Sequence, residues 1–403
     1  MNPQSLFTNY IIAGGEALLA RVHAAASVIP DADRQQAWHL LSFALKLDET
    51  WPVARALLLA LAPKMEQAGF REEWIPYLEQ GIHCAVRNGD ERTIAQCELQ
   101  IGLLYRLLSR FEEAEQCLTS SSVRFATQGN TTGQAHALLE LAWLVHLQHR
   151  YEMAERYVEQ AIKLPTTDRH VEANAWRMKG MIAIGRRQWR EAVEAHRKAL
   201  FHFQQLGDQR KVAWSMQNLG YALKELDMLD DAQNCLCQAA ETLHQLQDHY
   251  HLAVVRMNLA NVLVKQEKTK AAYDLFINAQ EVFARHGDSL SQAHVLTNLG
   301  IVLLELHESS AAQNQFRSAA QLYATLGDHV WYINALDGLV MALTAGGQYA
   351  EALTVADEAL ARLPSIQDSA YHDNLLGKLT GHRAEAKLKG EALPHNNCGK
   401  ASS

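Results

Sequence analysis

The chain contains 403 residues, of which 48% are hydrophobic and 20% are charged, and it carries a formal net charge of −8. This composition supports a sizeable core, and the lack of any block of Lys and Arg argues against nucleic-acid binding, which needs clustered cations to neutralise phosphate. No stretch stays apolar for the roughly 18 residues that a membrane span requires, so we expect no membrane contact. Glu16 interrupts the N-terminal apolar run, which is not typical of a signal peptide, and six cysteines in so long a chain fit free thiols in a reducing cytoplasm.

The first 90 residues carry a weak form of a pattern that becomes regular from residue 91 onward. Leu61-Ala62 and Gly81 fit the register of the later units, but Trp74 stands where those units have a small residue. Residues 51–90 must therefore pack differently from the rest. We assign residues 1–90 to degenerate N-terminal helical repeats.

Residues 91–366 contain seven repeats of about 40 residues each, and the step from Asn130 to Asp168 is slightly shorter than the others. Turns ending in Asp or Asn mark the units, at Asp90, Asn130, Asp168, Asp208, Asp248, Asp288, Asp328 and Asp368. One alanine position is unchanged throughout, at Ala114, Ala154, Ala192, Ala232, Ala272, Ala312 and Ala352. A second small position precedes it on the first stretch of each unit, at Gly102, Ala142, Gly180, Gly220, Ala260 and Gly300, with Val340 as the one large exception. Such a period predicts a repeat architecture.

Each unit holds two apolar-periodic stretches with i, i+3, i+4 spacing, which are too long for strands and therefore predict two helices. The turns between the stretches are short, so neighbouring helices must be antiparallel. The small-residue positions predict the points where two helices approach most closely. In the triplet at 206–208, Gly207 predicts a left-handed helix end and Asp208 predicts the N-cap of the next helix.

The last segments differ from the repeats. Residues 367–390 can form one further helix, which would cover the apolar face of the last complete unit. Residues 391–403 are polar and short of apolar side chains, so we expect a disordered tail.

These registers resemble the tetratricopeptide repeat (TPR). Leu219-Gly220 and Leu299-Gly300 match its Leu-Gly pair, Trp176 falls on its Trp position, and Pro364 falls on its late proline. The resemblance implies an all-α fold, a right-handed superhelical solenoid of antiparallel helix pairs. The units are longer than the usual repeat of about 34 residues. In this they are similar to the repeats of kinesin light chains, Pins-type adaptors, Rap-type regulators and MalT-like sensors.

In TPR proteins the second, fifth, sixth, ninth and twelfth places of each first helix face a concave groove, and the resemblance carries this onto the present chain. Asn218, Asn258 and Asn298 occupy the sixth place in three successive units. A carboxamide both donates and accepts hydrogen bonds, so this ladder could hold an extended peptide main chain. The alternative is a structural ladder in which each Asn bonds a neighbouring helix. The other candidate peptide-binding residues are Trp143, Arg177, Trp214, Gln217, Tyr221, Asn261 and Lys265.

The aromatic and basic groove residues also have a structural interpretation. Trp143, Trp214 and Tyr221 could stack on a ligand or simply pack between helices. Arg177, Lys224 and Lys265 could hold a carboxylate or belong to a solvated salt-bridge face. His146 and His149 have possible metal spacing, but no further ligands accompany them and we expect a solvated pair.

The sequence contains no phosphate-binding loop and no catalytic motif, so we expect no enzyme activity and no cofactor. We predict a cytoplasmic scaffold or adaptor that binds a peptide segment of a partner protein. The alternative, by resemblance to Rap-type and MalT-like regulators, is a sensor in which a signal peptide or small molecule controls a separate effector.

Overall fold

The computed structural model describes residues 3–25, 29–366 and 369–392, and within these ranges every regular element is a helix. The chain divides into two compact units, Met1–Asp248 and His249–Ser403. None of the described helices is long and apolar enough to cross a membrane.

The first unit contains twelve α-helices in its described part. They are α1 (Pro3–Ala24), α2 (Asp31–Ala44), α3 (Trp51–Gln67), α4 (Arg71–Arg87), α5 (Glu91–Leu107), α6 (Phe111–Thr127), α7 (Thr131–Leu147), α8 (Tyr151–Lys163), α9 (Arg169–Gly185), α10 (Trp189–Leu206), α11 (Gln209–Glu225) and α12 (Leu229–Gln245). A 3₁₀ turn at Asp48–Thr50 precedes α3.

The described part of the second unit contains seven α-helices. They are α13 (His249–Lys265), α14 (Thr269–Arg285), α15 (Ser289–Glu305), α16 (Ser309–Leu326), α17 (His329–Ala345), α18 (Tyr349–Arg362) and α19 (Ser369–Glu391). A 3₁₀ turn at Leu363–Ser365 follows α18. The predicted capping helix at 367–390 corresponds to α19, while residues 367–368 and, in the predicted tail, 393–403 lie outside the described residues.

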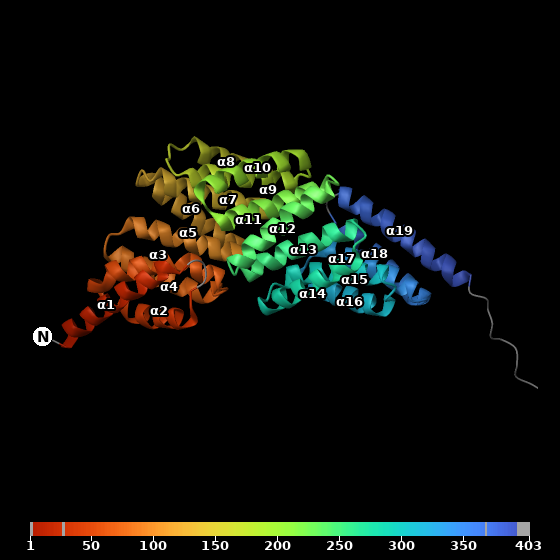
Figure 1. Ribbon diagram of the computed structural model, residues 1–403, viewed down its shortest axis with the longest axis horizontal. Coiled ribbons are helices and arrows are strands. Elements are labelled where there is room, and N and C mark those ends of the chain that lie inside the picture. Colours follow the sequence, from red (N-terminus) through yellow and green to blue (C-terminus); the bar gives the residue numbers. More distant parts are fainter. Residues whose placement is uncertain (1–2, 26–28, 367–368, 393–403) are drawn as a thin grey trace, which may run out of the picture. The chain divides into compact units, whose positions relative to one another are not determined.

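Within each unit, almost every helix packs against the next, and first helices also contact each other, as α7 contacts α9 and α15 contacts α17. Short turns join most of the helices, so sequential neighbours run antiparallel (Figure 1). The predicted all-α fold of antiparallel helix pairs is confirmed.

The predicted helix ends are also present. Gly207, Gly287 and Gly327 have left-handed φ values of 69°, 66° and 71°. The side chain of Asp208 accepts a hydrogen bond from the main-chain N–H of Lys211, and Asp288 and Asp328 cap α15 and α17 in the same way. One helix therefore ends and the next begins in adjacent residues, which keeps the turns short.

The small-residue positions are the close-contact points of the fold. All seven alanines of the invariant register are fully buried. A Cβ atom added to Gly220 would lie 2.7 Å from Leu236 Cγ, and one added to Gly300 would lie 2.6 Å from Phe316 Cζ. In the last repeat Val340 is buried, and Gly338 instead lies against Phe316. Glycine is needed here because the partner side chain fills the space of a Cβ.

The one shorter step of the repeat, from Asn130 to Asp168, shortens one helix. Helix α8 has 13 residues, whereas α6 and α12 have 17. Pro165 disfavours helical backbone at Leu164, which is extended with ψ 133°. The proline therefore ends α8 about one turn early.

Trp74 explains the irregular packing expected for residues 51–90. Its side chain is fully buried and stacks on Tyr77, with 5.4 Å between ring centroids. Gly81 lies against Leu58, and a Cβ there would be 2.8 Å from Leu58 Cδ1.

Candidate ligand-binding face

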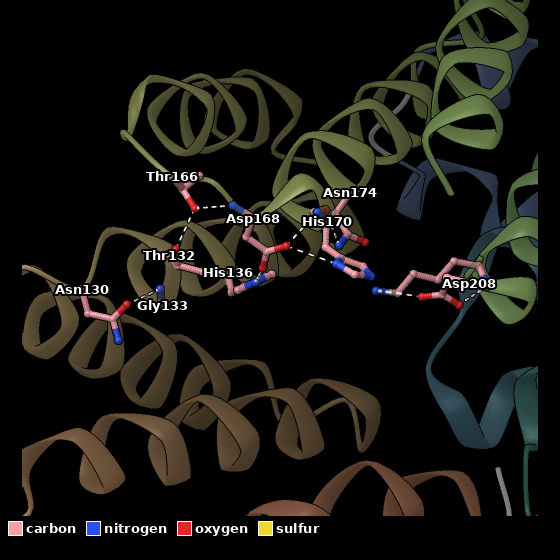
Figure 2. A network of polar contacts seen from close by, with 10 residues as sticks. Asn130, Thr132, Gly133, His136, Thr166, Asp168, His170, Asn174 and Asp208 are labelled. Atoms are coloured by element: carbon pink, nitrogen blue, oxygen red, sulfur yellow. Dashed lines mark hydrogen bonds and ion pairs between the residues drawn. The ribbon is translucent and has the colours of Figure 1, made fainter. Parts of the chain in front are cut away.

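A polar network links the N-terminal ends of first helices in the first unit (Figure 2). Asp168, the N-cap of α9, accepts a hydrogen bond from the main-chain N–H of His170 at 2.9 Å and pairs with His136 of α7 at 2.9 Å. Burial alone would raise the pKa of Asp168, but the hydrogen bonds from His170 and His136 outweigh burial and lower it. Asn174 donates to the carbonyl of His170 at 2.8 Å. Two groove positions, His136 and Asn174, thus hold helix ends in place.

A cleft of about 510 Å³ opens beside this network, between α5 and α7. Its lining residues are Leu59, Arg92, Gln96, Leu99, Gln100, Phe125, Asn130, Thr132, Gly133 and His136. In the described part of the chain, the half-buried carboxamides of Gln96 and Gln100 make no hydrogen bond. The cleft is therefore lined by two carboxamides that make no hydrogen bond among the described residues, together with the apolar side chains of Leu59, Leu99 and Phe125.

Gln100 occupies the sixth place of its helix, the place held by Asn218 in α11. It was not among the predicted site residues, because it is a glutamine and not one of the repeated asparagines. The signal was present in the sequence, because Gln100 precedes Asn218 by three steps of the repeat, one of which is the shorter step.

Arg106, Trp143 and Arg177 form a stack across α5, α7 and α9. The guanidinium carbons of Arg106 and Arg177 lie 5.4 Å and 4.4 Å from the centroid of the Trp143 ring. Arg106 also pairs with Glu140, with 3.1 Å from Nη2 to Oε2. The structure thus brings two predicted site residues, Trp143 and Arg177, into direct contact although they belong to different repeats. It adds Arg106 and Glu140 beside them.

Helix α11 carries four of the predicted residues. Trp214 lies 4.7 Å from the guanidinium of Arg210, and Tyr221 lies 4.6 Å from Lys224 Nζ. Both rings are half-buried, so packing accounts for part of each.

Lys224 also pairs with Glu225 at 2.7 Å, which confirms the salt-bridge interpretation for this lysine. The Oε1 atom of Gln217 is buried without a hydrogen-bonding partner. Asn218 is half-buried and makes no hydrogen bond to any described residue.

The second unit presents Asn258, Asn261 and Lys265 on α13 and Asn298 on α15. The three asparagines are half-buried, and Lys265 is exposed. As for Asn218, no hydrogen bond joins these carboxamides to another described residue. The interhelical bonds that a structural asparagine ladder requires are therefore missing from the described part of the chain.

The expectation of a solvated histidine pair at 146 and 149 was wrong for His146. This side chain is only 9% exposed, and burial together with the charge of His149 lowers its pKa to about 4. His149 is exposed and bonds the hydroxyl of Tyr151 at 2.8 Å. Among the residues that the structure describes, no three His, Cys, Asp or Glu side chains are grouped as a metal site would need.

Comparison with known proteins identifies the repeat. The model of the family described as "Tetratricopeptide repeat" matches residues 93–166 and 251–325. No curated protein matches the sequence.

Solved structures share the fold at low sequence identity. A Rap protein complexed with Competence and Sporulation Factor has a TM-score of 0.56 and 13% identity, over 83% of this chain and 99% of that one. NprR in complex with its cognate peptide NprX has a TM-score of 0.53 and 13% identity, over 74% of this chain and 88% of that one. A signal transduction ATPase with a tetratricopeptide repeat sensor, from Pyrococcus horikoshii, has a TM-score of 0.61 and 12% identity, over 86% of this chain and 53% of that one.

The family match covers two separate segments, and the helix pairs between and around them follow the same small-residue registers. Residues 93–166 and 251–325 thus match the tetratricopeptide repeat, and the solved structures share the fold of the chain.

Proposed function

We propose that this protein is a non-enzymatic interaction protein that binds an extended peptide segment along its first helices. The observation that carries the proposal is the set of half-buried carboxamides at the sixth place that make no hydrogen bond to a described residue, namely Asn218, Asn258 and Asn298. A half-buried amide that makes no internal bond retains its hydrogen-bonding capacity for a ligand, and an extended peptide offers a donor and an acceptor at each residue.

The repeat family and the fold support a role in protein interaction or sensing, and TPR folds are typical of non-catalytic interaction proteins. The ligand we propose is a protein or peptide rather than a nucleic acid or a membrane, and the compartment we propose is the cytoplasm. The net charge of −8 and the family match support this choice.

A sensor role is the second candidate, and one observation favours it. Among the structures that share the fold, one is complexed with Competence and Sporulation Factor, one is in complex with its cognate peptide, and a third contains a tetratricopeptide repeat sensor. In this version, binding of a signal peptide to the same face would change the conformation of the array and so alter a separate effector.

The test begins with peptides selected by the full-length chain from a random dodecapeptide library. Their affinity is then measured for Asn218→Ala in the first unit and for the double variant Asn258→Ala/Asn298→Ala in the second. A carboxamide that makes two hydrogen bonds to the peptide should contribute about tenfold to Kd. Asn234→Ala is the matched control, because Asn234 is exposed on α12, a second helix.

Loss of affinity in either groove variant, with unchanged thermal unfolding, would support the proposal and show which unit binds. Unchanged affinity in both variants would refute it. A fall in thermal stability without peptide would instead favour the structural ladder. The sensor version requires, in addition, that small-angle scattering of the chain changes when the selected peptide is added.

A further inference from the structure

The Arg106–Trp143–Arg177 stack combines two cations with one indole ring. The two guanidinium groups come from α5 and α9, and their central carbons lie 5.4 Å and 4.4 Å from the centroid of the ring on α7. A cation over an indole is stabilised by the ring quadrupole. The indole therefore keeps both cations in place on the face of the first helices.

Only one of the two cations has a counter-ion in direct contact. Glu140 Oε2 lies 3.2 Å from Arg106 Nε and 3.1 Å from Arg106 Nη2. Arg177, in contrast, makes no ion pair or hydrogen bond to any described residue, and its Nε is buried without a partner. Removing a charge from water without a partner is costly, so this arginine can accept an anion that the described part of the chain does not place against it.

The charges around Arg177 leave an excess of positive charge in the stack. Burial lowers the pKa of Arg177 to about 10, with a smaller contribution in the same direction from the charge of Arg106, while the carboxylates of Glu140 and Asp208 act to raise it; the group stays cationic at neutral pH. The other cation nearby, Lys211, pairs with Asp208 at 3.7 Å. Arg106, Glu140 and Arg177 together carry one uncompensated positive charge.

These features select a carboxylate over other anions. A single negative charge neutralises the cluster, whereas a dianionic phosphate would leave excess negative charge beside Glu140. The planar guanidinium matches the two oxygens of a carboxylate, and Arg106 already pairs with a carboxylate oxygen of Glu140 beside the same indole ring. Trp143 would exclude water from one side of the new pair and so strengthen it.

We propose that this stack is a carboxylate-binding subsite, in which Arg177 takes a carboxylate of the bound peptide. The carboxylate belongs to an Asp or Glu side chain or to the peptide C-terminus. The inference rests on the proposed peptide-binding function and names the chemistry of one part of the ligand. The cleft lined by Gln96 and Gln100 opens between α5 and α7, the helices that carry Arg106 and Trp143, and is available to the adjoining main chain.

The experiment uses the random dodecapeptide library in two forms, with a C-terminal acid and with a C-terminal amide. If a side chain supplies the carboxylate, amidated peptides that bind should be enriched in Asp or Glu at one position. If the C-terminus supplies it, only the acid form should yield binders. Binders with no preference for a carboxylate in either form would overturn the subsite while leaving the peptide-binding function in place.

A double-mutant cycle then tests Arg177 itself. Arg177→Gln should weaken a selected peptide about tenfold, and replacing the peptide carboxylate by an amide should cost the same in wild type and nothing more in the variant. Arg177→Lys should restore part of the affinity, because it keeps the charge but loses the planar fork. Arg197→Gln, an exposed arginine on α10, is the matched control and should bind as wild type does. Additive losses in the cycle would overturn the proposal.

A measurement without peptide separates the subsite from the proposed function. The Arg177 Nε–Hε resonance, assigned by its absence in Arg177→Gln, should shift to saturation with sodium acetate and not with sodium chloride at equal ionic strength. A shift with acetate when no peptide is ever selected would keep the subsite and refute the peptide function. Equal responses to both salts would refute the subsite.

Discussion

His196 is a fully buried histidine whose two ring nitrogens have no hydrogen-bonding partner in the described structure. It lies against Gly180, where an added Cβ would be 2.6 Å from its Nε2 atom. Equivalent places in other second helices hold apolar side chains, such as Leu118 and Leu236, which are also fully buried. We therefore predict that His196→Leu stabilises the protein.

The magnitude follows from two contributions. Removing an unsatisfied buried donor and acceptor should gain about 2 kcal/mol, after allowance for imperfect fit of the leucine. Burial, together with the charge of Arg177, lowers the pKa of His196 to about 3. Because the pKa in the folded state lies below the unfolded value of about 6.5, the unfolded chain takes up the proton first, and stability falls as the pH drops below 6.5. The loss should be about 1.4 kcal/mol per pH unit until the pH approaches the folded pKa.

The assay is urea unfolding of the full chain at pH 7.0, 6.0 and 5.0, combined with hydrogen exchange of α9 and α10, because repeat arrays can open locally. The difference between His196→Leu and wild type should widen toward acid pH. His244→Gln, on the exposed face of α12, should change stability by less than about 0.5 kcal/mol at every pH. A destabilised His196→Leu variant, or one whose pH dependence equals that of wild type, would refute the reasoning.

Two further predictions concern packing and the last helix. Gly220→Ala places a Cβ 2.7 Å from Leu236 Cγ and should destabilise the first unit by about 1–3 kcal/mol. At Gly377 an added Cβ would have no atom within 4 Å, so Gly377→Ala should be neutral or stabilising by up to about 1 kcal/mol. Urea unfolding of both variants checks these two values. His382 of α19 forms a hydrogen bond of 2.7 Å with the buried Asp337, and this bond raises the pKa of His382. The stabilisation from this contact should therefore be complete below pH 6.5, and it should be lost as the pH rises through the pKa of His382 in the folded protein. Hydrogen exchange of α19, corrected for intrinsic rates, should therefore accelerate between pH 6 and 8.5, and it should lose this dependence in Asp337→Asn.

The fold could be predicted from the sequence because the close-contact positions tolerate only small residues. Small residues recur with the period of the array at the positions of Ala232 and Gly220, and both of these residues are buried. The helix ends were equally predictable, since Gly207 and Asp208 have conformational and hydrogen-bonding roles that few other residues fill. The early end of α8 was not predicted, although Pro165 was its signal.

The candidate site was less predictable, because side chains from different repeats create it. Trp143 and Arg177 were each identified by their place on a first helix, but their contact depends on how two repeats pack. Arg106 was not among the candidate residues, because its place beside Trp143 likewise depends on that packing. The burial of His146 was missed because its spacing to His149 suggested a pair on one solvated face, whereas only His149 is exposed.

The structure of the chain with the tightest selected peptide tests the central claim most directly. We expect an extended peptide on first helices, with at least one sixth-place carboxamide within about 3.2 Å of a peptide main-chain atom. The four candidates are Gln100, Asn218, Asn258 and Asn298. A peptide bound instead on second helices, or one that leaves all four carboxamides without contact, would contradict it.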